Sequence, residues 1–198
     1  MVNNLNREFF TDKYSINDKE CLPNTLLVRF EEILNQLDYP KVKVTLNGEQ
    51  AGDIIDDNSF IDDGYRYHDV FHYTFATLLD WSPCARAMLK RKRKSNVDID
   101  RVEDGARAAI TEEAISLMIF EEAKKNNFYK RNEKVSPFIL DTIKLMTNSF
   151  EVRVKSREDW EKAILKSYEL FRLLIKNKGG QIFFDRVNKT IEYKKILN

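Results

Sequence analysis

The sequence predicts a mainly α-helical fold, a helical bundle that carries a small antiparallel β element. Residues 65–79 are apolar or aromatic at almost every position, and residues 101–127 repeat apolar side chains at the spacing of a helix face. Polar and apolar residues alternate in residues 41–46, 150–155 and 181–195, which is typical of half-buried strands. We therefore expect two long central helices with short strands beside them.

Composition and charge exclude several classes of protein. The 198 residues are enough for one packed domain with a small appendage, and 42% of them are hydrophobic. Lys and Arg number 33 against 32 Asp and Glu, whereas nucleic-acid and membrane-surface proteins usually carry a strong imbalance. We therefore expect no stable binding of nucleic acid and no association with a membrane.

The cysteines and the N-terminal residues predict a cytoplasmic protein. Cys21 and Cys84 are far apart and form no CxxC motif, so we expect free thiols rather than a disulfide framework. The first residues lack the apolar core of a signal peptide, and no run of about 18 apolar residues occurs in the sequence.

The region before the first central helix is predicted to contain a helix, a strand and an acidic loop. Apolar residues recur at helical spacing in residues 25–37, and Pro40 would end that helix. The strand of residues 41–46 leads into an Asn-Gly turn. Residues 53–63 contain five aspartates, and such loops are usually solvated turns.

The first central helix places an acid and two histidines among apolar side chains. Within residues 65–79 the strongly polar positions are Arg66, His68, Asp69 and His72. A buried carboxylate without a partner costs several kcal/mol, so Asp69 must be paired, protonated or bound to a metal. One interpretation is an ion pair between Arg66 and Asp69, with both histidines hydrogen-bonded in the core. The other interpretation is a metal site.

A basic run lies between the two central helices. Ser82 is predicted to cap a helix that starts at Pro83 and continues to about residue 94. We expect members of the run to neutralise the phosphates of a bound substrate. The cations assigned to this role are Lys90, Arg91, Arg93 and Lys94. A solvated helix face and a nuclear-localisation signal are the alternatives.

The second central helix carries two adjacent glutamates. Glu113 falls in phase with Ile110 and Leu117 on the predicted buried face, and Glu112 has small and apolar residues one turn away. Two such carboxylates repel each other, and a divalent cation would offset the repulsion. The alternative is that both glutamates reach solvent at the helix edge. Facing helices of a bundle build carboxylate metal sites, so we expect Asp69 to share a site with both glutamates.

The C-terminal part is predicted to be a strand, a long helix and a β-hairpin. Ser156 and Asp159 form the signature of a capping box for a helix over residues 157–178, and a Gly-Gly pair would end that helix. We divide the chain into a helical domain with an N-terminal extension, residues 1–148, and a C-terminal strand–helix–hairpin element, residues 149–198, packed on that domain.

Three blocks of the sequence together resemble a known family. They are DDGYRYHDVFHYTFATLLDWSP, LKRKRKS and VEDGARAAITEEAI. Over roughly residues 45–125, the chain resembles the MazG-like nucleotide pyrophosphohydrolases of the all-α NTP pyrophosphatase superfamily. The resemblance implies a helical bundle and a homo-oligomer, a dimer or larger. It also implies hydrolysis of a nucleoside triphosphate to the monophosphate and pyrophosphate, with Mg²⁺, or alternatively Mn²⁺, held by acids on two helices.

The sequence departs from the usual signature of that family, which is EExxE on one helix and ExxD on the next. Ser116 stands where EExxE has its third acid, Arg66 stands where ExxD has its Glu, and the ExxD-like helix comes first. The resemblance implies that Asp69, Glu112 and Glu113 are catalytic residues and metal ligands.

Other residues must complete a site that lacks two signature acids. The residues considered for this are His72 as a further metal ligand, His68 and Asp63 as substrate-binding residues, and Asp62 and Asp104. One glutamate, Glu112 or Glu113, would orient or deprotonate the attacking water. An aromatic ring would stack on the base, and the candidates are Tyr65, Tyr67 and Trp81.

Two other functions stay open. The His68-Asp69 doublet is typical of HD-type metal phosphohydrolases, but that chemistry needs a further upstream histidine, and the only histidines are His68 and His72. The two replaced acids keep open a catalytically degenerate helical module that binds a nucleotide or a protein partner.

Overall fold

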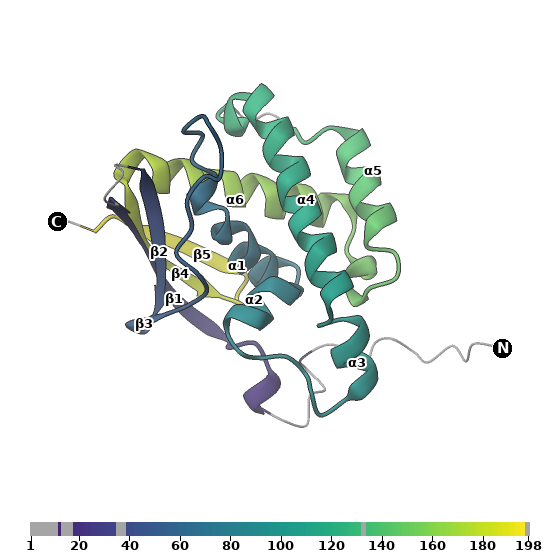
Figure 1. Cartoon of the computed structure of the whole chain (residues 1–198). Helices are drawn as coiled ribbons and strands as arrows, with labels where there is room; N and C mark the ends of the chain where they lie inside the picture. Colours follow the sequence, from purple (N-terminus) through teal and green to yellow (C-terminus); the bar gives the residue numbers. More distant parts are fainter. Residues whose placement is uncertain (1–11, 13–17, 35–38, 132–133, 197–198) are drawn as a thin grey trace.

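The computed structural model describes residues 12, 18–34, 39–131 and 134–196. These residues form six α-helices and a five-stranded antiparallel sheet (Figure 1), which confirms the predicted mainly α fold with a smaller β part. The helices are α1 (Asp69–Leu78), α2 (Pro83–Met88), α3 (Val97–Val102), α4 (Ala106–Lys125), α5 (Pro137–Met146) and α6 (Arg157–Asn177). Short 3₁₀ segments are Asp18–Glu20, Tyr65–Tyr67, Asn127–Tyr129 and Glu151–Val154. In this described part, no helix is long and apolar enough to cross a membrane.

The sheet joins strands from distant parts of the chain. Its strands are β1 (Thr25–Leu34), β2 (Pro40–Leu46), β3 (Glu49–Gln50), β4 (Gly179–Asp185) and β5 (Thr190–Lys194). They follow the order β3-β2-β1-β4-β5, and β1 is antiparallel to both β2 and β4. The predicted strand of residues 41–46 and the hairpin of residues 181–195 are therefore confirmed. Strands from both sides of the predicted boundary at residue 148 belong to one sheet.

The first strand corrects a predicted helix. Leu26, Val28 and Phe30 are buried on one face of β1, and the residues between them are more exposed. The apolar residues of this segment fit the period of a helix as well as that of a strand, so periodicity alone could not decide between them. Pairing with β2 and β4 supplies the backbone hydrogen bonds on both edges, and this tertiary context selects the strand. Residues 35–38 of the predicted helix lie outside the described residues.

The predicted strand of residues 150–155 is also wrong, because this segment contains the 3₁₀ turn Glu151–Val154. The backbone N–H of Glu151 donates to Glu103 at 3.0 Å, and the Glu151 carboxylate accepts a hydrogen bond from Arg93 at 3.0 Å. Bonds to buried side chains, rather than to a neighbouring strand, therefore determine the backbone here.

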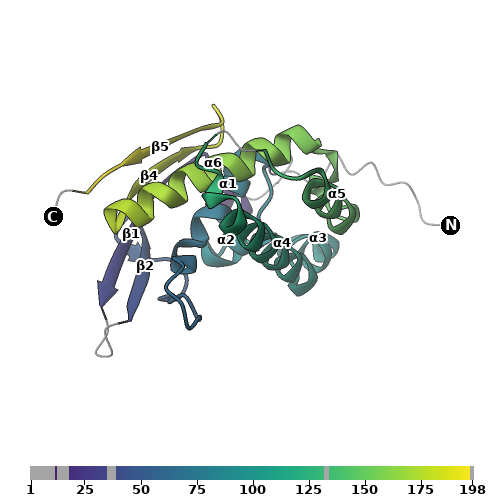
Figure 2. The same cartoon turned by 90° about the horizontal axis from the view of Figure 1, so that it is seen from above.

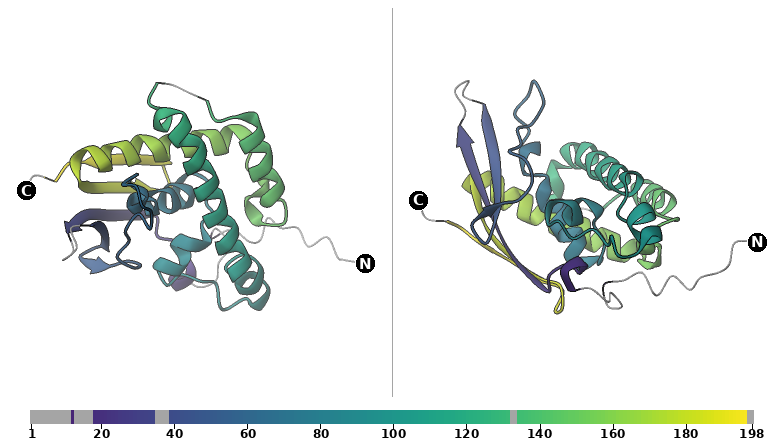
Figure 3. Two further views of the ribbon diagram at one scale, coloured as in Figure 1. Left: turned by 45° about the horizontal axis from the view of Figure 1, so that its top comes forward. Right: turned by 60° about the horizontal axis from the view of Figure 1, so that its bottom comes forward.

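Helices cover one face of the sheet. α6 lies along the sheet, and α1 packs against α6, β4 and β5 (Figure 2). α4 and α5 lie farther from the sheet, and α2 contacts both α1 and α4 (Figure 3). Because α1 is covered on most sides, nearly all of its residues are buried, as its continuous apolar sequence predicts.

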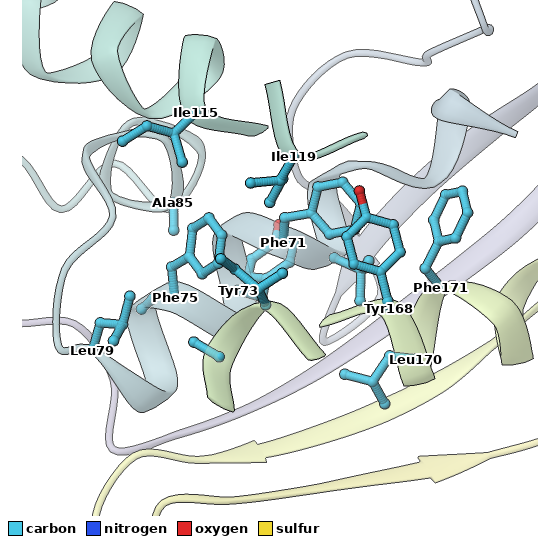
Figure 4. Packing of buried hydrophobic residues seen from close by; sticks show 14 of the residues in the cluster. Phe71, Tyr73, Phe75, Leu79, Ala85, Ile115, Ile119, Tyr168, Leu170 and Phe171 are labelled. Carbon is cyan, nitrogen blue, oxygen red and sulfur yellow. The ribbon is translucent and has the colours of Figure 1, made fainter. Parts of the chain in front are cut away.

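Aromatic side chains fill the space between α1 and α6. The ring of Phe71 lies 5.0 Å from the ring of Tyr168 and 5.7 Å from that of Phe171, between centroids (Figure 4). Ile115 and Ile119 of α4 belong to the same core. Full burial of a large apolar side chain contributes about 1.5–3 kcal/mol, so this core holds α1 and α4 in fixed positions.

The predicted helix caps are present, but two helix limits differ. Ser82 Oγ accepts a hydrogen bond from Ala85 N at the start of α2, and Ser156 and Asp159 form the predicted capping box of α6. α2 ends at Met88, so residues 90–94 lie beyond it. The predicted helix over residues 101–127 is divided into α3 and α4, because the chain bends between Val102 and Ala106.

The buried face of α4 differs from the predicted one by one residue. Glu112 is fully buried, whereas Ile110 and Leu117, the predicted neighbours of Glu113 on the buried face, are 68% and 51% exposed. Ile115 and Ile119 of the core share the face of Glu112. The two adjacent glutamates therefore have different surroundings: Glu112 is fully buried, and the Glu113 side chain is 47% exposed.

Candidate functional site

Three polar side chains at the start of α1 line one cavity. His68 follows the 3₁₀ segment Tyr65–Tyr67, and Asp69 and His72 lie in the first turn of α1. Residues three and four apart lie on the same side of a helix, so His72 stands beside both His68 and Asp69. One ligand atom from each of these three residues lies within 4.8 Å of the other two.

Glu112 contacts the Nδ1 atom of His72 and so orients the ring. His72 Nδ1 lies 2.8 Å from Glu112 Oε1, which also accepts a hydrogen bond from Ser82 Oγ at 2.7 Å. Glu112 Oε2 accepts one from the backbone N–H of Cys84, at 2.9 Å. Both oxygens of this fully buried carboxylate are therefore used. A carboxylate in this position fixes the orientation and the tautomer of a histidine ring.

Glu113 reaches the cavity from α4. Its Oε1 lies 3.2 Å from His72 Nε2 and 3.4 Å from Cys84 Sγ. Its Oε2 lies 3.9 Å from His68 Nε2. The side chain is 47% exposed, so Glu113 is open both to the cavity and to solvent.

The ring of His68 is fixed by the segment that precedes it. His68 Nδ1 lies 3.0 Å from the carbonyl oxygen of Tyr65, and the two rings stack with their centroids 4.4 Å apart. A carbonyl oxygen can only accept, so Nδ1 carries the proton and Nε2 keeps a lone pair in the neutral ring. This Nε2 lies 3.7 Å from Asp69 Oδ1.

Two buried polar atoms in this cavity make no well-aligned hydrogen bond to a described residue. Asp69 Oδ2 makes no hydrogen bond within the described part of the chain, and His72 Nε2 makes no well-aligned one there, although Glu113 Oε1 lies 3.2 Å from it. Each such atom costs about 1–3 kcal/mol, and native proteins contain few of them. The loop at Gly52, with φ of +77°, comes close to this place, because a Cβ there would stand 3.9 Å from Asp69 Oδ2. Two unsatisfied atoms together favour a bound cation.

The cavity has a volume of about 620 Å³. Beside His68, Asp69, His72 and Glu113, most of its lining is apolar, and the described residues of the lining include no Lys or Arg. We call this site the histidine cavity, after the two histidines that share it. Its size is typical of a small-molecule site.

The charges around the histidine cavity shift each other's pKa. Burial raises the pKa of Asp69, and Glu113 and Glu112 act in the same direction. Burial lowers the pKa of His68, so this imidazole is neutral at neutral pH. For His72, burial acts to lower the pKa, but the neighbouring Glu112 and Glu113 raise it well above its usual value. Burial acts to raise the pKa of Glu113, but His72 and His68 lower it to about 2.

Comparison with known families decides the identity of the chain. The family model of the MazG C-terminal domain matches residues 7–197, nearly the whole sequence. The chain belongs to this family. The match extends well beyond residues 45–125, over which the sequence blocks carry the resemblance, and it includes the C-terminal helix and hairpin. Searches of the curated proteins and of the solved structures returned no match.

Arg66, at the position where the resemblance to the MazG-like pyrophosphohydrolases implies the Glu of ExxD, has structural contacts. Arg66 is buried, and its guanidinium lies 3.0 Å from Glu32, 2.8 Å from Asp57 and 2.7 Å from Asp62. The alternative interpretation, an ion pair between Arg66 and Asp69, is therefore wrong. Asp62 is part of this cluster and does not line the histidine cavity.

Ser116, at the position where the resemblance implies the third acid of EExxE, is fully buried, and its hydroxyl has no hydrogen-bond partner among the described residues. Asp63 pairs with Lys124 at 3.3 Å, and Asp104 pairs with Arg93 at 2.6 Å. Neither Asp63 nor Asp104 lines the histidine cavity, so of the residues considered as replacements only the two histidines do.

The cations of the basic run do not line the histidine cavity, contrary to the prediction. Arg93 is buried, and its guanidinium binds Asp104 and Glu151. Arg91 lines a separate cavity, and Lys90 and Lys94 are exposed. The physical reason is the early end of α2, after which Lys90 takes a left-handed conformation with φ of 56° and the chain leaves the cavity.

Sequence reasoning missed two parts of the site. Cys84 lines the cavity and donates its backbone N–H to Glu112, and the Ser82-Pro83 cap signal that precedes it could have indicated this. Gly52 lies in a loop for which the sequence carries no such signal. Of the three aromatic candidates for stacking, Tyr65 lines the cavity, while Tyr67 and Trp81 are buried in the core.

Proposed function

We propose that this chain is a divalent-cation-dependent nucleoside triphosphate pyrophosphohydrolase that releases a nucleoside monophosphate, ribo or deoxy, and pyrophosphate. One observation carries the proposal. Asp69 from α1 and Glu113 from α4 line the same cavity, and Asp69 Oδ2 in it has no hydrogen-bond partner among the residues that the structure describes. Acids from two helices around one site are what the resemblance to the MazG-like pyrophosphohydrolases implies, and the family match supports the same assignment.

The residues proposed to hold the cation are Asp69, His72 and Glu113, with His68 beside them. The unsatisfied Asp69 Oδ2 and His72 Nε2 support this fit, because both are buried acceptors when the ring is neutral. When bound, a divalent cation would bridge phosphate oxygens and offset the charge that develops on the leaving pyrophosphate.

Glu113 is the residue proposed to orient the attacking water. Its carboxylate is partly exposed, and a pKa of about 2 keeps it ionised at neutral pH. Glu112 is unsuited to this role, because both of its oxygens already accept hydrogen bonds from other groups. A carboxylate with so low a pKa is a weak base, so Glu113 would position the water more than it would deprotonate it.

The lining of the histidine cavity constrains how a triphosphate could enter. Carboxylates face the cavity, and no Lys or Arg occurs among the described lining residues. An anionic triphosphate would therefore be repelled unless divalent cations accompany it. The ring of Tyr65 and the apolar side chains of Met88 and Leu117 are suited to contact the base.

A second candidate function is a degenerate module that binds a nucleotide or a protein partner without hydrolysis. The observation that favours it is the replacement of two signature acids by Arg66, which is held in an ion cluster, and by Ser116, which is buried. The two functions differ in whether pyrophosphate is released.

The test is pyrophosphate release from a panel of ribo- and deoxynucleoside triphosphates, with Mg²⁺ and with Mn²⁺, and after chelation. Glu113→Gln is compared with Glu121→Gln, which changes a carboxylate of similar exposure on the same helix. We expect cation-dependent release that falls by about 100-fold or more in Glu113→Gln and is unchanged in Glu121→Gln. No release from any triphosphate by the folded wild type would reject hydrolysis and favour the binding module.

A further inference from the structure

We infer that the histidine cavity is built for a first-row transition-metal ion rather than for Mg²⁺, with His68 Nε2, Asp69, His72 Nε2 and Glu113 as its ligands. The inference deepens the proposed function, because it names the class of cation that this cavity selects. It depends on the donor atoms that face the cavity and on the groups that orient them.

Both histidines present Nε2 to the cavity. The Nδ1 atom of His68 is bonded to the carbonyl oxygen of Tyr65, and that of His72 to the Glu112 carboxylate. Each of these acceptors favours a proton on Nδ1, so in the neutral rings both Nε2 atoms are left with a lone pair that a metal ion can take. Metal-bound histidines in proteins are held in this manner by outer carboxylates or carbonyl groups.

These lone pairs face carboxylate oxygens. His72 Nε2 lies 3.2 Å from Glu113 Oε1, and His68 Nε2 lies 3.7 Å from Asp69 Oδ1. An imidazole lone pair and a carboxylate oxygen repel each other, so this arrangement is unfavourable unless a proton or a metal cation lies between them. The buried Asp69 Oδ2, which no described residue bonds, points to the same need.

The distances between the donor atoms are close to those around a single bound metal ion. Four ligands on bonds of about 2.0–2.1 Å stand roughly 3.3 Å apart around a tetrahedral metal. Three pairs of donors here, each a histidine nitrogen and a carboxylate oxygen, are separated by 3.2, 3.7 and 3.9 Å. One donor atom each of His68, Asp69 and His72 lie within 4.8 Å of one another, and the partly exposed Glu113 side chain has the freedom to move toward them.

The donor atoms discriminate between cations. Mg²⁺ prefers oxygen ligands and keeps several of its waters, whereas imidazole nitrogen suits Mn²⁺, Fe²⁺, Co²⁺ and Zn²⁺ increasingly well. Two of the four donors here are imidazole nitrogens, and the remaining described lining is mostly apolar, with the exposed Asp53 as its one further carboxylate. Such a site discriminates against Mg²⁺, because few oxygen ligands are offered to replace the waters that it would lose.

The experiment measures metal binding by the full chain without nucleotide. Protein freed of metal with a chelator is titrated with Co²⁺, Mn²⁺ and Mg²⁺ by calorimetry, and the visible spectrum of bound Co²⁺ reports nitrogen ligation. We expect one Co²⁺ per chain, bound at least about 100-fold more tightly than Mg²⁺, with Mn²⁺ between them. Equal affinities for Co²⁺ and Mg²⁺, or no Co²⁺ bound at all, would overturn the inference.

Variants assign the ligands. His68→Gln and Glu113→Gln should each weaken Co²⁺ binding by about 10-fold or more and change its spectrum, whereas Glu121→Gln should leave both unchanged. Circular dichroism checks folding, and His68 is the safer histidine to replace, because His72 is more deeply buried. Unchanged Co²⁺ binding in folded His68→Gln would place the metal elsewhere and reject this ligand set.

The outcome is separable from that of the proposed function. Tight Co²⁺ binding without pyrophosphate release would reject the hydrolase and leave the metal site. Pyrophosphate release with Mg²⁺ by a chain that binds Co²⁺ no more tightly would support the hydrolase and reject the metal preference.

Discussion

Two regions of this molecule bury acidic side chains, and they differ in whether the buried carboxylates have hydrogen-bond and ion-pair partners. In the first, which we call the Arg93 cluster, two arginines meet three acids; its members are Arg86, Arg93, Glu103, Asp104 and Glu151. The Arg93 guanidinium forms ion pairs with both Asp104, at 2.6 Å, and Glu151, at 2.9 Å. In the second, the histidine cavity, Asp69 keeps one oxygen without a partner in the described structure.

This difference in pairing separates a structural role for the Arg93 cluster from a functional role for the histidine cavity. Buried charges that are paired and hydrogen-bonded maintain a fold, whereas unsatisfied groups reduce its stability and are retained where something else binds. Arg93 belongs to a basic run whose sequence predicts phosphate binding, yet its contacts are those of a structural residue. Replacement of a group in the Arg93 cluster should therefore reduce stability, whereas replacement of a group in the histidine cavity should reduce ligand binding.

The largest effect is expected for Arg93→Ala. It leaves Asp104 and Glu151 buried without their main cation, so we expect a loss of about 3–5 kcal/mol in the free energy of unfolding. Urea or guanidinium denaturation measures this. The neighbouring Lys94 is exposed, and Lys94→Ala should change stability by no more than about 0.5 kcal/mol. Equal effects of the two variants would show that Arg93 is not structural.

The second effect is a dependence of stability on pH. The Arg93 cluster contains more acids than arginines, and burial, together with Glu103, raises the pKa of Glu151 to about 7 against the attraction of Arg93. The folded state therefore favours the protonated acid. This stabilisation is fully present below pH 4.5 and is lost as the pH rises through 7.

Glu151→Gln cannot titrate at this position, so the difference in stability between the wild type and this variant reports the titration of Glu151. One pKa unit corresponds to about 1.4 kcal/mol, so the wild type should lose up to about 3 kcal/mol relative to Glu151→Gln between pH 4 and pH 8. Denaturation at several pH values measures the difference, and the exposed Glu121→Gln should follow the wild type. A constant difference between wild type and Glu151→Gln would mean that folding does not raise the pKa of Glu151.

The same comparison shows what the sequence could predict. Asp69 and Glu113 were predictable, because an acid in an apolar helix and a pair of adjacent acids are visible as exceptions to a helical pattern. The choice of Arg93 as the buried member of five adjacent cations was not, since it depends on acids that the fold brings from Asp104 and Glu151. A run of charges carries no signal of which member faces inward.

The secondary structure of two segments also could not be predicted from the local sequence. The apolar residues of β1 fit a helix, and the alternation in residues 150–155 fits a strand, yet both predictions are wrong. In each case partners distant in sequence decide the backbone: β4 pairs with β1, and Glu103 and Arg93 bind Glu151. The hairpin of β4 and β5 was predictable because its partners are neighbours in sequence.

The third effect distinguishes the two regions by their response to metal. If the histidine cavity binds a divalent transition metal, a concentration 100-fold above the dissociation constant should stabilise the wild type by about 2.7 kcal/mol, roughly 5–10 °C in Tm. Thermal unfolding with Mn²⁺ measures this, and chelation should reverse it. Glu113→Gln, if it weakens binding by about 10-fold or more, should lose about half of the shift or more, whereas Glu151→Gln should keep it. A shift of equal size in both variants would assign the stabilisation to another site.

The smallest effect comes from two buried serines in helices. Ser167 Oγ donates to the carbonyl oxygen of Ala163 at 2.8 Å, while Ser116 Oγ, one turn after Glu112, has no partner among the described residues. Ser167→Ala should therefore cost about 0.5–1.5 kcal/mol, and Ser116→Ala should be neutral or stabilise by about 1 kcal/mol, because it removes an unsatisfied hydroxyl. Chemical denaturation of the metal-free proteins measures both changes. If Ser116→Ala costs as much as Ser167→Ala, the Ser116 hydroxyl has a bonding partner such as an ordered water. The replaced signature position would then be a satisfied polar site, comparable to the Arg93 cluster rather than to the histidine cavity.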